Sequence, residues 1–246
     1  DKGDTAHPSF WSGNRTSMTP AKLLADAEML KAEAKKRGLE MPSVASYIDS
    51  SNLANVEDTF KAAAAVGAKN IRIGPGGYNP ASGPFWKQWE IARERYAAVA
   101  SLAAKHKVKA LVETHMGLLT PTTFTARKLL EGLSPENVGI MWDPGNQVVE
   151  GNEPYAMAID IAGEYLGEVH AKNLRQVVRD VADGREVWHA PAAPLRLGQV
   201  DWPAVVRELK KVGYNGWVQF EDFSSEHPLD ERLKDNAAWF RELLAK

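Results

Sequence analysis

The stretch Lys109–Gly117, KALVETHMG, decides how the chain is interpreted. Three apolar residues at positions 110–112 enter it and a glycine closes it, a pattern typical of a buried strand. Because side chains alternate across a strand, Glu113 and His115 lie on one face. A carboxylate at the end of an apolar strand costs free energy unless it meets a cation or hydrogen-bond donors. The stretch therefore predicts a strand whose end carries chemistry.

Three later strands end in the same way, each in a residue type that binds metals. VGIMWDPGN ends at Asp143, GEVHAKN at His170 and WVQFED at Glu221. Glu113, Asp143 and His170 follow one another at intervals of about 30 residues, the length of one βα unit. The last interval is longer because an extra hairpin is inserted, with Asp183-Gly184 as its turn. The repeat predicts that all four residues reach the same end of one parallel sheet.

Strands and helices alternate along the whole chain. We expect strands at 41–48, 70–73, 109–117, 137–142, 165–169 and 216–220, and helices at 20–38, 56–66, 86–106, 121–131, 154–164, 201–213 and 227–245. This alternation indicates parallel strands with right-handed crossovers. We expect an α/β fold, a (β/α)8 TIM barrel lacking its first one to two βα units, and residues 1–246 as one N-terminally incomplete domain. A doubly wound open sheet is the alternative.

Composition excludes several classes of protein. The 246 residues are 44% hydrophobic and 25% charged, which suits one soluble domain. A formal charge of −2 gives no reason to expect a nucleic acid or an anionic membrane as partner. There is no apolar run long enough to span a membrane and no signal-peptide pattern at the start. The absence of cysteine excludes disulfides and thiolate ligands and fits a cytoplasmic protein. The oligomeric state stays open, homo-oligomers included.

Three carboxylates that converge would repel one another unless a cation joined them. Taken singly, an acidic residue at a strand end is more often a helix cap, and a lone histidine an ordinary hydrogen-bonded residue. Four such residues at repeat spacing are a stronger signal. An oxygen-rich set with one imidazole suits Mn²⁺, Mg²⁺, Co²⁺ or Zn²⁺. We therefore predict one divalent metal ion held by Glu113, Asp143, His170 and Glu221.

The chain resembles the sugar phosphate isomerase/epimerase family of xylose-isomerase-like TIM barrels, which includes ketose 3-epimerases and inosose dehydratases. The resemblance rests on VETH (112–115), WDPGN (142–146), VHAKN (169–173) and QFED (219–222). It implies the same four metal ligands, with Glu113 and Glu221 as the acid/base pair on opposite faces of a sugar substrate. The family commonly has a substrate-binding histidine where this chain has Asn146, so the exact reaction stays open.

The chemistry that the resemblance implies is proton abstraction next to a carbonyl. A metal ion acting as Lewis acid stabilises an enediolate, and one glutamate removes the proton that the other returns. Lys172 shares a face with His170 and is a candidate to stabilise the developing oxyanion; the alternative is a solvated strand-end lysine. We expect a small carbohydrate as substrate and a role in carbohydrate metabolism.

Further residues are candidates for binding substrate. His115 lies one step beyond Glu113, and Asn146 follows Asp143. The alternative for His115 is an ordinary hydrogen bond at the rim. Arg175 is a further candidate, with a surface position as its alternative. Trp188, in the hairpin, is a candidate lid, with a place in the core or rim as its alternative. Near the N-terminus, His7, Trp11 and Asn14 are weaker candidates at the mouth of the barrel.

Three other functions compete with an isomerase or epimerase. A metal-dependent dehydratase (a lyase) of a cyclic keto-polyol, such as an inosose or dehydroshikimate, would use the same enolate and expel a hydroxyl group. An AP endonuclease of the related zinc fold needs more histidines than the six present and a basic face for DNA. A non-catalytic sugar-binding barrel would keep the fold without tight metal binding. Product analysis and metal analysis separate these alternatives.

Overall fold

The computed structural model describes residues 18–245 and divides into two compact units. Unit 1 holds the described residues up to Glu113 together with Lys128–Gly139, and unit 2 holds Thr114–Arg127 and the residues from Ile140 onward. The chain passes from one unit to the other after Glu113, within α5 (Thr123–Leu130) and within β4 (Val138–Trp142).

Unit 1 is built from helices that pack on one another and on short strands. Its elements are α1 (Pro20–Ala25), α2 (Ala27–Lys36), β1 (Ser43–Val44), α3 (Leu53–Val66), β2 (Asn70–Arg72), the 3-10 helix η1 (Pro80–Ser82), α4 (Phe85–His106) and β3 (Lys109–Glu113). Helix α3 packs against α1, α2 and α4. Its start is fixed by Asn52, whose side chain accepts the Asn55 N–H, and its end by Gly67 in the left-handed region (φ 81°).

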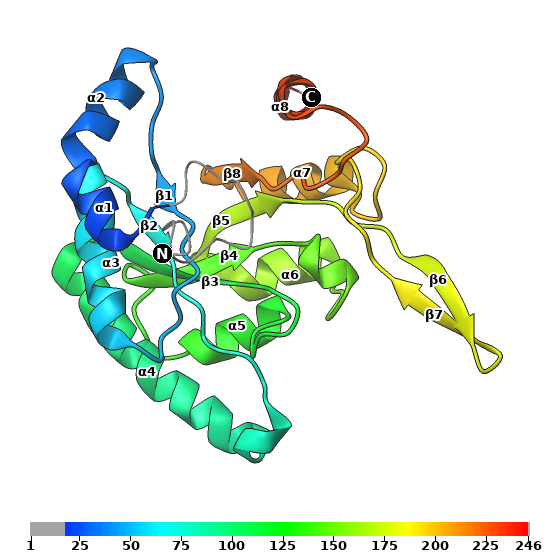
Figure 1. Cartoon of the computed structure of the whole chain (residues 1–246), viewed down its shortest axis with the longest axis horizontal. Helices are drawn as coiled ribbons and strands as arrows, with labels where there is room; N and C mark the ends of the chain where they lie inside the picture. Colours follow the sequence, from blue (N-terminus) through cyan, green and yellow to red (C-terminus); the bar gives the residue numbers. More distant parts are fainter. Residues whose placement is uncertain (1–17, 246) are drawn as a thin grey trace. The chain divides into compact units, whose positions relative to one another are not determined.

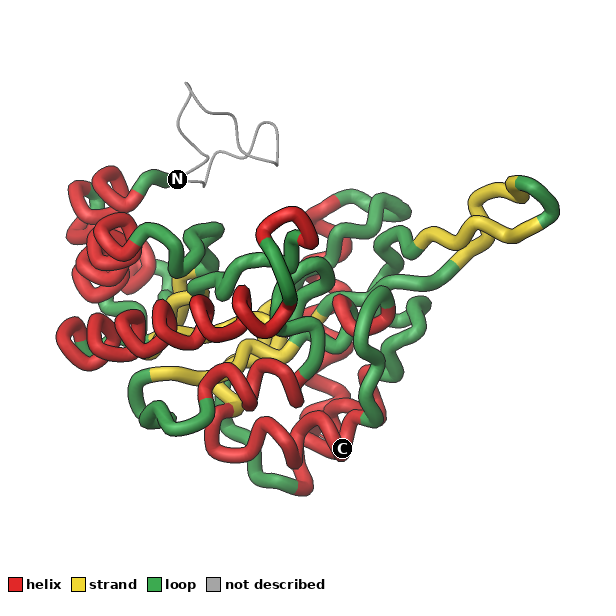
Figure 2. Tube along the Cα trace, turned by 90° about the horizontal axis from the view of Figure 1, so that it is seen from below, coloured by secondary structure: helices red, strands yellow, loops and turns green. Residues whose placement is uncertain are grey.

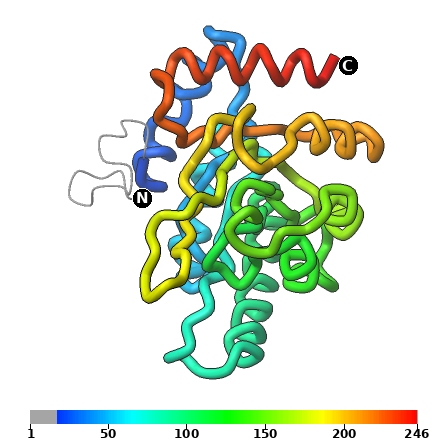
Figure 3. The backbone as a smooth tube through the Cα atoms, turned by 90° about the vertical axis from the view of Figure 1, so that its right-hand side faces the viewer, coloured from blue at the N-terminus to red at the C-terminus, as the bar shows by residue number. Residues whose placement is uncertain are grey.

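Unit 2 contains the remaining strands and the helices that follow them. Its elements are the 3-10 helix η2 (Asn146–Val148), α6 (Tyr155–Ala162), the 3-10 helix η3 (Gly163–Tyr165), β5 (Leu166–Ala171), β6 (Val177–Ala182), β7 (Arg185–His189), α7 (Trp202–Lys211), β8 (Trp217–Phe220) and α8 (Leu229–Ala245). Helix α7 packs against α6 and against α8. In Figure 3, α7 is orange and α8 is red. The apolar face of α7 is anchored by the fully buried indole of Trp202.

Within the described residues, the main sheet has six strands in the order β1-β2-β3-β4-β5-β8 (Figure 1). The strands are parallel, and the order follows the chain, as successive βα units require. The α/β, TIM-barrel-like fold predicted from the sequence is therefore confirmed. All five residues of β4 are buried, as expected for a strand covered on both faces.

Three expected elements are shorter or more broken than the sequence pattern suggested. The first helix is interrupted at Asp26, whose backbone (φ −91°, ψ 3°) leaves the helical region between α1 and α2. The first strand is only Ser43–Val44 instead of 41–48, because the Ser46 hydroxyl binds the Arg72 carbonyl. The key strand ends at Glu113, because the His115 N–H turns back to the Thr120 carbonyl. The ends of these elements therefore depend on single backbone conformations and individual hydrogen bonds, which the hydrophobic pattern does not encode.

The inserted hairpin has the predicted form. Strands β6 and β7 pair antiparallel across Asp183 (φ 51°) and Gly184 (φ 72°), both in the left-handed region that a tight two-residue turn requires. Figure 2 shows the ribbon extending away from the helices that precede and follow it. Every residue of both strands is exposed to solvent. Among the residues described, no helix has the length and apolar character needed to cross a membrane.

Candidate metal centre

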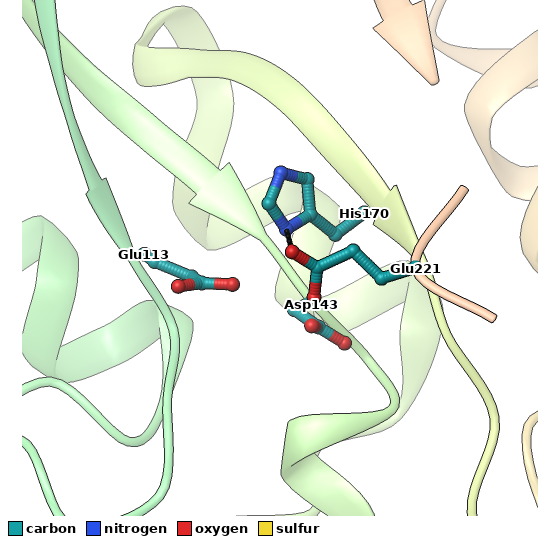
Figure 4. A group of neighbouring side chains, drawn as sticks. All are labelled: Glu113, Asp143, His170 and Glu221. Atoms are coloured by element: carbon teal, nitrogen blue, oxygen red, sulfur yellow. Dashed lines mark ion pairs between the residues drawn. The ribbon is translucent and has the colours of Figure 1, made fainter. Parts of the chain in front are cut away.

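The four residues predicted as metal ligands offer ligand atoms that all lie within 4.8 Å of one another (Figure 4). They are Glu113, Asp143, His170 and Glu221. The last three belong to unit 2, and Glu113 is the residue of unit 1 that is bonded to Thr114 of unit 2. The four residues are grouped because each lies at or just after the carboxyl end of a strand, and parallel strands have their carboxyl ends at the same edge of a sheet.

Asp143 lies at the end of β4 and is held by the loop that follows. The Asp143 N–H donates to the Thr114 hydroxyl over 2.8 Å. Both carboxylate oxygens accept from Asn146, one from its backbone N–H (3.0 Å) and one from its amide group (2.8 Å). A Cβ at Gly145 would lie 2.8 Å from the Lys172 Cβ, so only glycine allows the loop this close. The WDPGN sequence therefore fixes the orientation of the Asp143 carboxylate.

Lys172 joins two of the carboxylates. Its ammonium group lies 2.9 Å from an Asp143 oxygen and 2.6 Å from a Glu221 oxygen. It also donates to the side-chain oxygen of Asn146 over 3.1 Å, and it lies 5.3 Å from the centre of the Phe223 ring. Lys172 is only 6% exposed, so the alternative of a solvated strand-end lysine does not apply. The buried ammonium instead offsets negative charge within the cluster.

Glu221 and His170 form the second pair. One Glu221 oxygen lies 3.3 Å from Nδ1 of the buried His170, and the Glu221 N–H continues the sheet by donating to the Ala171 carbonyl. Burial by itself raises the pKa of the Glu221 carboxyl, but hydrogen bonds and charge from His170 and Lys172 outweigh it and lower that pKa overall. The group is therefore held as a carboxylate, the form that ligates metals.

Glu113 has a partner that the sequence analysis did not identify. An Nη atom of Arg72 lies 2.7 Å from a Glu113 oxygen, and both side chains are buried, at 10% and 3% exposure. The position of Arg72 between Ile71 and Ile73, two completely buried residues, is the feature of the sequence that could have indicated this ion pair. A charged residue inside such a strand points to the opposite face and needs a counter-charge there.

The donor set fits a divalent cation. In unit 2, the carboxylates of Asp143 and Glu221 carry two negative charges, and Lys172 supplies one positive charge. With a neutral His170 imidazole, this group of side chains has a net negative charge. Carboxylate oxygens with one imidazole nitrogen suit Mg²⁺, Mn²⁺ and related ions better than soft metals. The residues present are therefore able to hold one such ion, whose identity the donor types alone do not select.

The remaining predicted residues lie in different environments. His115 is partly buried, and its Nδ1 lies 2.7 Å from the Met116 carbonyl, which can only accept. Nδ1 therefore donates a proton to this bond, and in the corresponding neutral tautomer Nε2 is the acceptor. Asn146 is fully buried among Asp143, Thr114 and Lys172.

Arg175 and Trp188 lie nearer the surface. Arg175 pairs with Glu226 over 3.2 Å, and both side chains are exposed. Trp188 is 57% exposed on β7. The remaining three candidates, His7, Trp11 and Asn14, lie outside the described residues. The substrate-binding roles of all these residues stay predictions.

Comparison with known proteins identifies a family. The family model described as "Xylose isomerase-like TIM barrel" matches residues 5–243. Among curated proteins, the chain is 27% identical over 156 residues to the rhizopine catabolism protein MocC of Rhizobium meliloti, covering 58% of this chain and 46% of that protein. It is 25% identical over 160 residues to an inosose dehydratase of Clostridium tetani, covering 60% and 52%. These matches span about half the length of those relatives.

Solved structures share the fold at lower sequence identity. A 3-keto-D-glucoside 4-epimerase from E. coli superposes with a TM-score of 0.70 at 21% identity, covering 91% of this chain and 87% of that one. A xylose isomerase-like TIM barrel protein from Mycobacterium smegmatis, solved in complex with magnesium, gives a TM-score of 0.67 at 19% identity, covering 90% and 78%. At these identities the likeness concerns the fold alone.

Proposed function

Because the chain belongs to the xylose isomerase-like TIM barrel family, we propose that it is a metal-dependent isomerase or epimerase that acts on a sugar or sugar derivative. The observation that carries this proposal is the grouping of Glu113, Asp143, His170 and Glu221 at strand ends. The chain would transfer a proton at the carbon next to a carbonyl group. Its substrate would be a small carbohydrate.

The four grouped residues would hold the ion. Once bound, a divalent cation supplies Lewis-acid stabilisation of negative charge on the substrate's carbonyl and neighbouring hydroxyl oxygens. The relative from Mycobacterium smegmatis supports this assignment, because its structure contains magnesium. In this chain, Asn146 would keep the Asp143 carboxylate turned toward the ion through its two hydrogen bonds.

Glu113 and Glu221 would carry the proton. They follow different strands, β3 and β8, and the family resemblance implies that they act as the acid/base pair on opposite faces of the sugar. One carboxylate removes the proton next to the carbonyl, and the other returns it to the opposite face or to the adjacent carbon. The lowered pKa of Glu221 keeps it ionised and therefore able to accept a proton.

Lys172 would stabilise the negative charge that develops on the substrate. Its ammonium group is already held by Asp143 and Glu221, so little reorganisation is needed when the oxyanion forms. Around the reacting carbon, His115 would accept a hydroxyl hydrogen at Nε2. Arg175 and Trp188 would contact more distant parts of the sugar. Asn146 was predicted to bind substrate, but its bonds to Asp143 and Lys172 favour an orienting role.

A dehydratase remains the second candidate function. It is supported by the similarity to inosose dehydratases, including the one from Clostridium tetani. The first step would be the same proton removal, and the product would differ because a hydroxyl group next to the new enolate leaves as water. The protonated form of Glu113 or Glu221 would then donate to the leaving hydroxyl.

The test is a panel of ketoses and cyclic ketones incubated in D₂O with Mn²⁺, Mg²⁺ or Co²⁺. We expect deuterium to enter at the carbon next to the carbonyl, together with a new sugar for an epimerase or an enone for a dehydratase. Glu113→Gln and Glu221→Gln should each abolish exchange, whereas Glu164→Gln, at an exposed glutamate, should not. Exchange that persists in both active-site variants would remove the proposed acid/base pair.

A further inference from the structure

Arg72 lies buried at the end of β2, and we propose that it is a positioning residue that holds the Glu113 carboxylate in the orientation needed for proton transfer. This inference rests on the proposed function, because it assigns Arg72 a role only through Glu113. It is based on the contacts of the Arg72 guanidinium group with Ser46, Tyr47 and Glu113, all in unit 1.

The strand register brings the two side chains to one face. Arg72 is the partner of Leu111 in the parallel pair β2·β3, and Glu113 lies two residues further along β3. Residues two apart on a strand share a face, so Glu113 is the diagonal neighbour of Arg72. The opposite face of β2 carries Ile71, which is completely buried in the apolar core. The charged end of Arg72 therefore has one direction available, toward Glu113.

The guanidinium group is held at more than one atom. Its Nε donates to the Ser46 carbonyl over 2.8 Å, while Nη1 donates to Glu113 over 2.7 Å. The group also lies 4.7 Å from the centre of the Tyr47 ring, a cation–π distance. The Ser46 hydroxyl in turn donates to the Arg72 carbonyl over 2.5 Å. These contacts fix the guanidinium plane before any substrate binds, so it can fix the carboxylate.

The chemistry requires arginine at this position. A guanidinium group is planar, always charged and presents several N–H donors at fixed angles, whereas a lysine ammonium is a single point of charge. Lysine would retain attraction to Glu113 but would lose the bond to Ser46 that sets the direction of the group. A purely structural ion pair would need the charge alone. The response to lysine therefore separates positioning from simple charge compensation.

The first experiment measures whether Arg72 and Glu113 are coupled, independently of substrate. The full chain is freed of metal with a chelator, and thermal unfolding is compared for the wild type, Arg72→Gln, Glu113→Gln and the double variant. Each single variant leaves a buried charge without its partner, so we expect each to lower the melting temperature by roughly 5 to 15 °C. The double variant should recover much of that loss. Additive losses would overturn the pairing.

The second experiment measures positioning in the metal-loaded enzyme, with deuterium exchange into a turned-over substrate as readout. We expect Arg72→Gln to lower kcat by about 100-fold with little change in KM, because a misplaced base slows the chemical step and not binding. Arg72→Lys should lower kcat by an intermediate factor and lower the melting temperature less than Arg72→Gln does, because it keeps the charge opposite Glu113. The control is Arg196→Gln, which removes an exposed pair with Asp235 and should leave kcat unchanged.

The outcomes distinguish this inference from the proposed function. If the wild type exchanges no proton with any substrate, the proposed function fails, and the thermal unfolding comparison still decides whether Arg72 and Glu113 are paired. If the wild type turns over and both Arg72 variants keep its kcat, Arg72 does not position the base. A fall in kcat for Arg72→Gln that Arg72→Lys restores completely would also overturn the proposal, because charge alone would then be sufficient.

Discussion

The loops of unit 2 around Asp143 and the β6–β7 hairpin of the same unit are stabilised in opposite ways. Around Asp143, buried polar groups bind one another, and a single glycine at position 145 allows their close approach. In the hairpin, all strand residues are exposed, and the conformation depends on the turn at Asp183-Gly184. An isolated two-stranded ribbon is only marginally stable in water. Polar interactions are therefore concentrated where side chains must be oriented.

The comparison predicts that substitutions near Asp143 cost stability and activity together, whereas hairpin substitutions cost little stability. The largest effect is expected for Lys172→Met. This change leaves the buried Asp143 and the partly buried Glu221 without their shared cation, and breaking a buried ion pair costs about 3–5 kcal/mol. Thermal unfolding of the metal-free protein measures the loss, and activity should be lost as well.

A double variant sharpens that experiment. Adding Asp143→Asn to Lys172→Met removes one of the two uncompensated carboxylates, so part of the lost stability should return. Mn²⁺ should also stabilise the Lys172→Met protein more than the wild type, because the ion would replace the missing positive charge. A Lys172→Met protein that melts within about 1 °C of the wild type would show that the ammonium does not offset the carboxylates.

Asn146→Ala is expected to have the second largest effect. The variant removes the amide that donates to Asp143 and to the Thr114 carbonyl, and Lys172 loses an acceptor. Leaving buried groups without hydrogen bonds costs about 1–3 kcal/mol. Losing a residue that orients a metal ligand typically weakens metal affinity or activity by about 10- to 100-fold. Calorimetric titration with Mn²⁺ measures the affinity.

The matched control for Asn146 is Asn152→Ala, at an exposed asparagine nearby in the chain. It should leave both the melting temperature and the Mn²⁺ affinity unchanged. Equal effects of the two alanine substitutions would mean that the hydrogen bonds to Asp143 do not orient it.

Asp222→Asn is expected to lower the stability of the folded state by a smaller amount, which depends on pH. Burial raises the pKa of the Asp222 carboxyl, but hydrogen bonds from Ser224 and Asn236 and the charge of Arg232 lower it overall. A carboxyl with a lowered pKa stabilises the folded state above its ordinary pKa, and this contribution is lost as the pH falls through the folded-state value. The stability difference between wild type and Asp222→Asn should therefore be largest above about pH 5 and shrink on acidification.

Chemical unfolding of both proteins at pH values between neutral and about 3 measures this difference. A difference that stays constant over the range would mean that the Asp222 carboxylate is not stabilised by those partners.

The smallest stability effect is expected for Trp188→Ala in the hairpin. Because the indole is 57% exposed, its removal should change the free energy of unfolding by less than about 0.5 kcal/mol. If Trp188 contacts substrate, KM should rise while kcat stays near the wild-type value. Val181→Ser, at an exposed valine of the same hairpin, is the control and should change neither. An unchanged KM for Trp188→Ala would remove the proposed contact.

The sequence predicted the order of strands and helices and the grouping of four ligand types, because both follow from local patterns that recur once per βα unit. It did not predict the ion pair of Arg72 with Glu113, because an arginine in a short strand resembles a surface residue until the register with the partner strand is known. The sequence also did not predict that Lys172 and Asn146 are buried and hydrogen-bonded to each other, because that contact joins two different strand ends. Element ends such as the break at Asp26 depend on single backbone conformations, which periodicity does not encode.

Calorimetric titration of the metal-free chain with Mn²⁺ decides whether Glu113, Asp143, His170 and Glu221 form one metal site. Four side chains that hold one ion should give one binding site per chain, and Asp143→Asn and His170→Gln should each abolish binding or weaken it by at least about 10-fold. Glu164→Gln, at an exposed glutamate, should bind as the wild type does. A wild-type chain that binds no Mn²⁺, or ligand variants that bind it equally well, would show that these four side chains do not form a metal site.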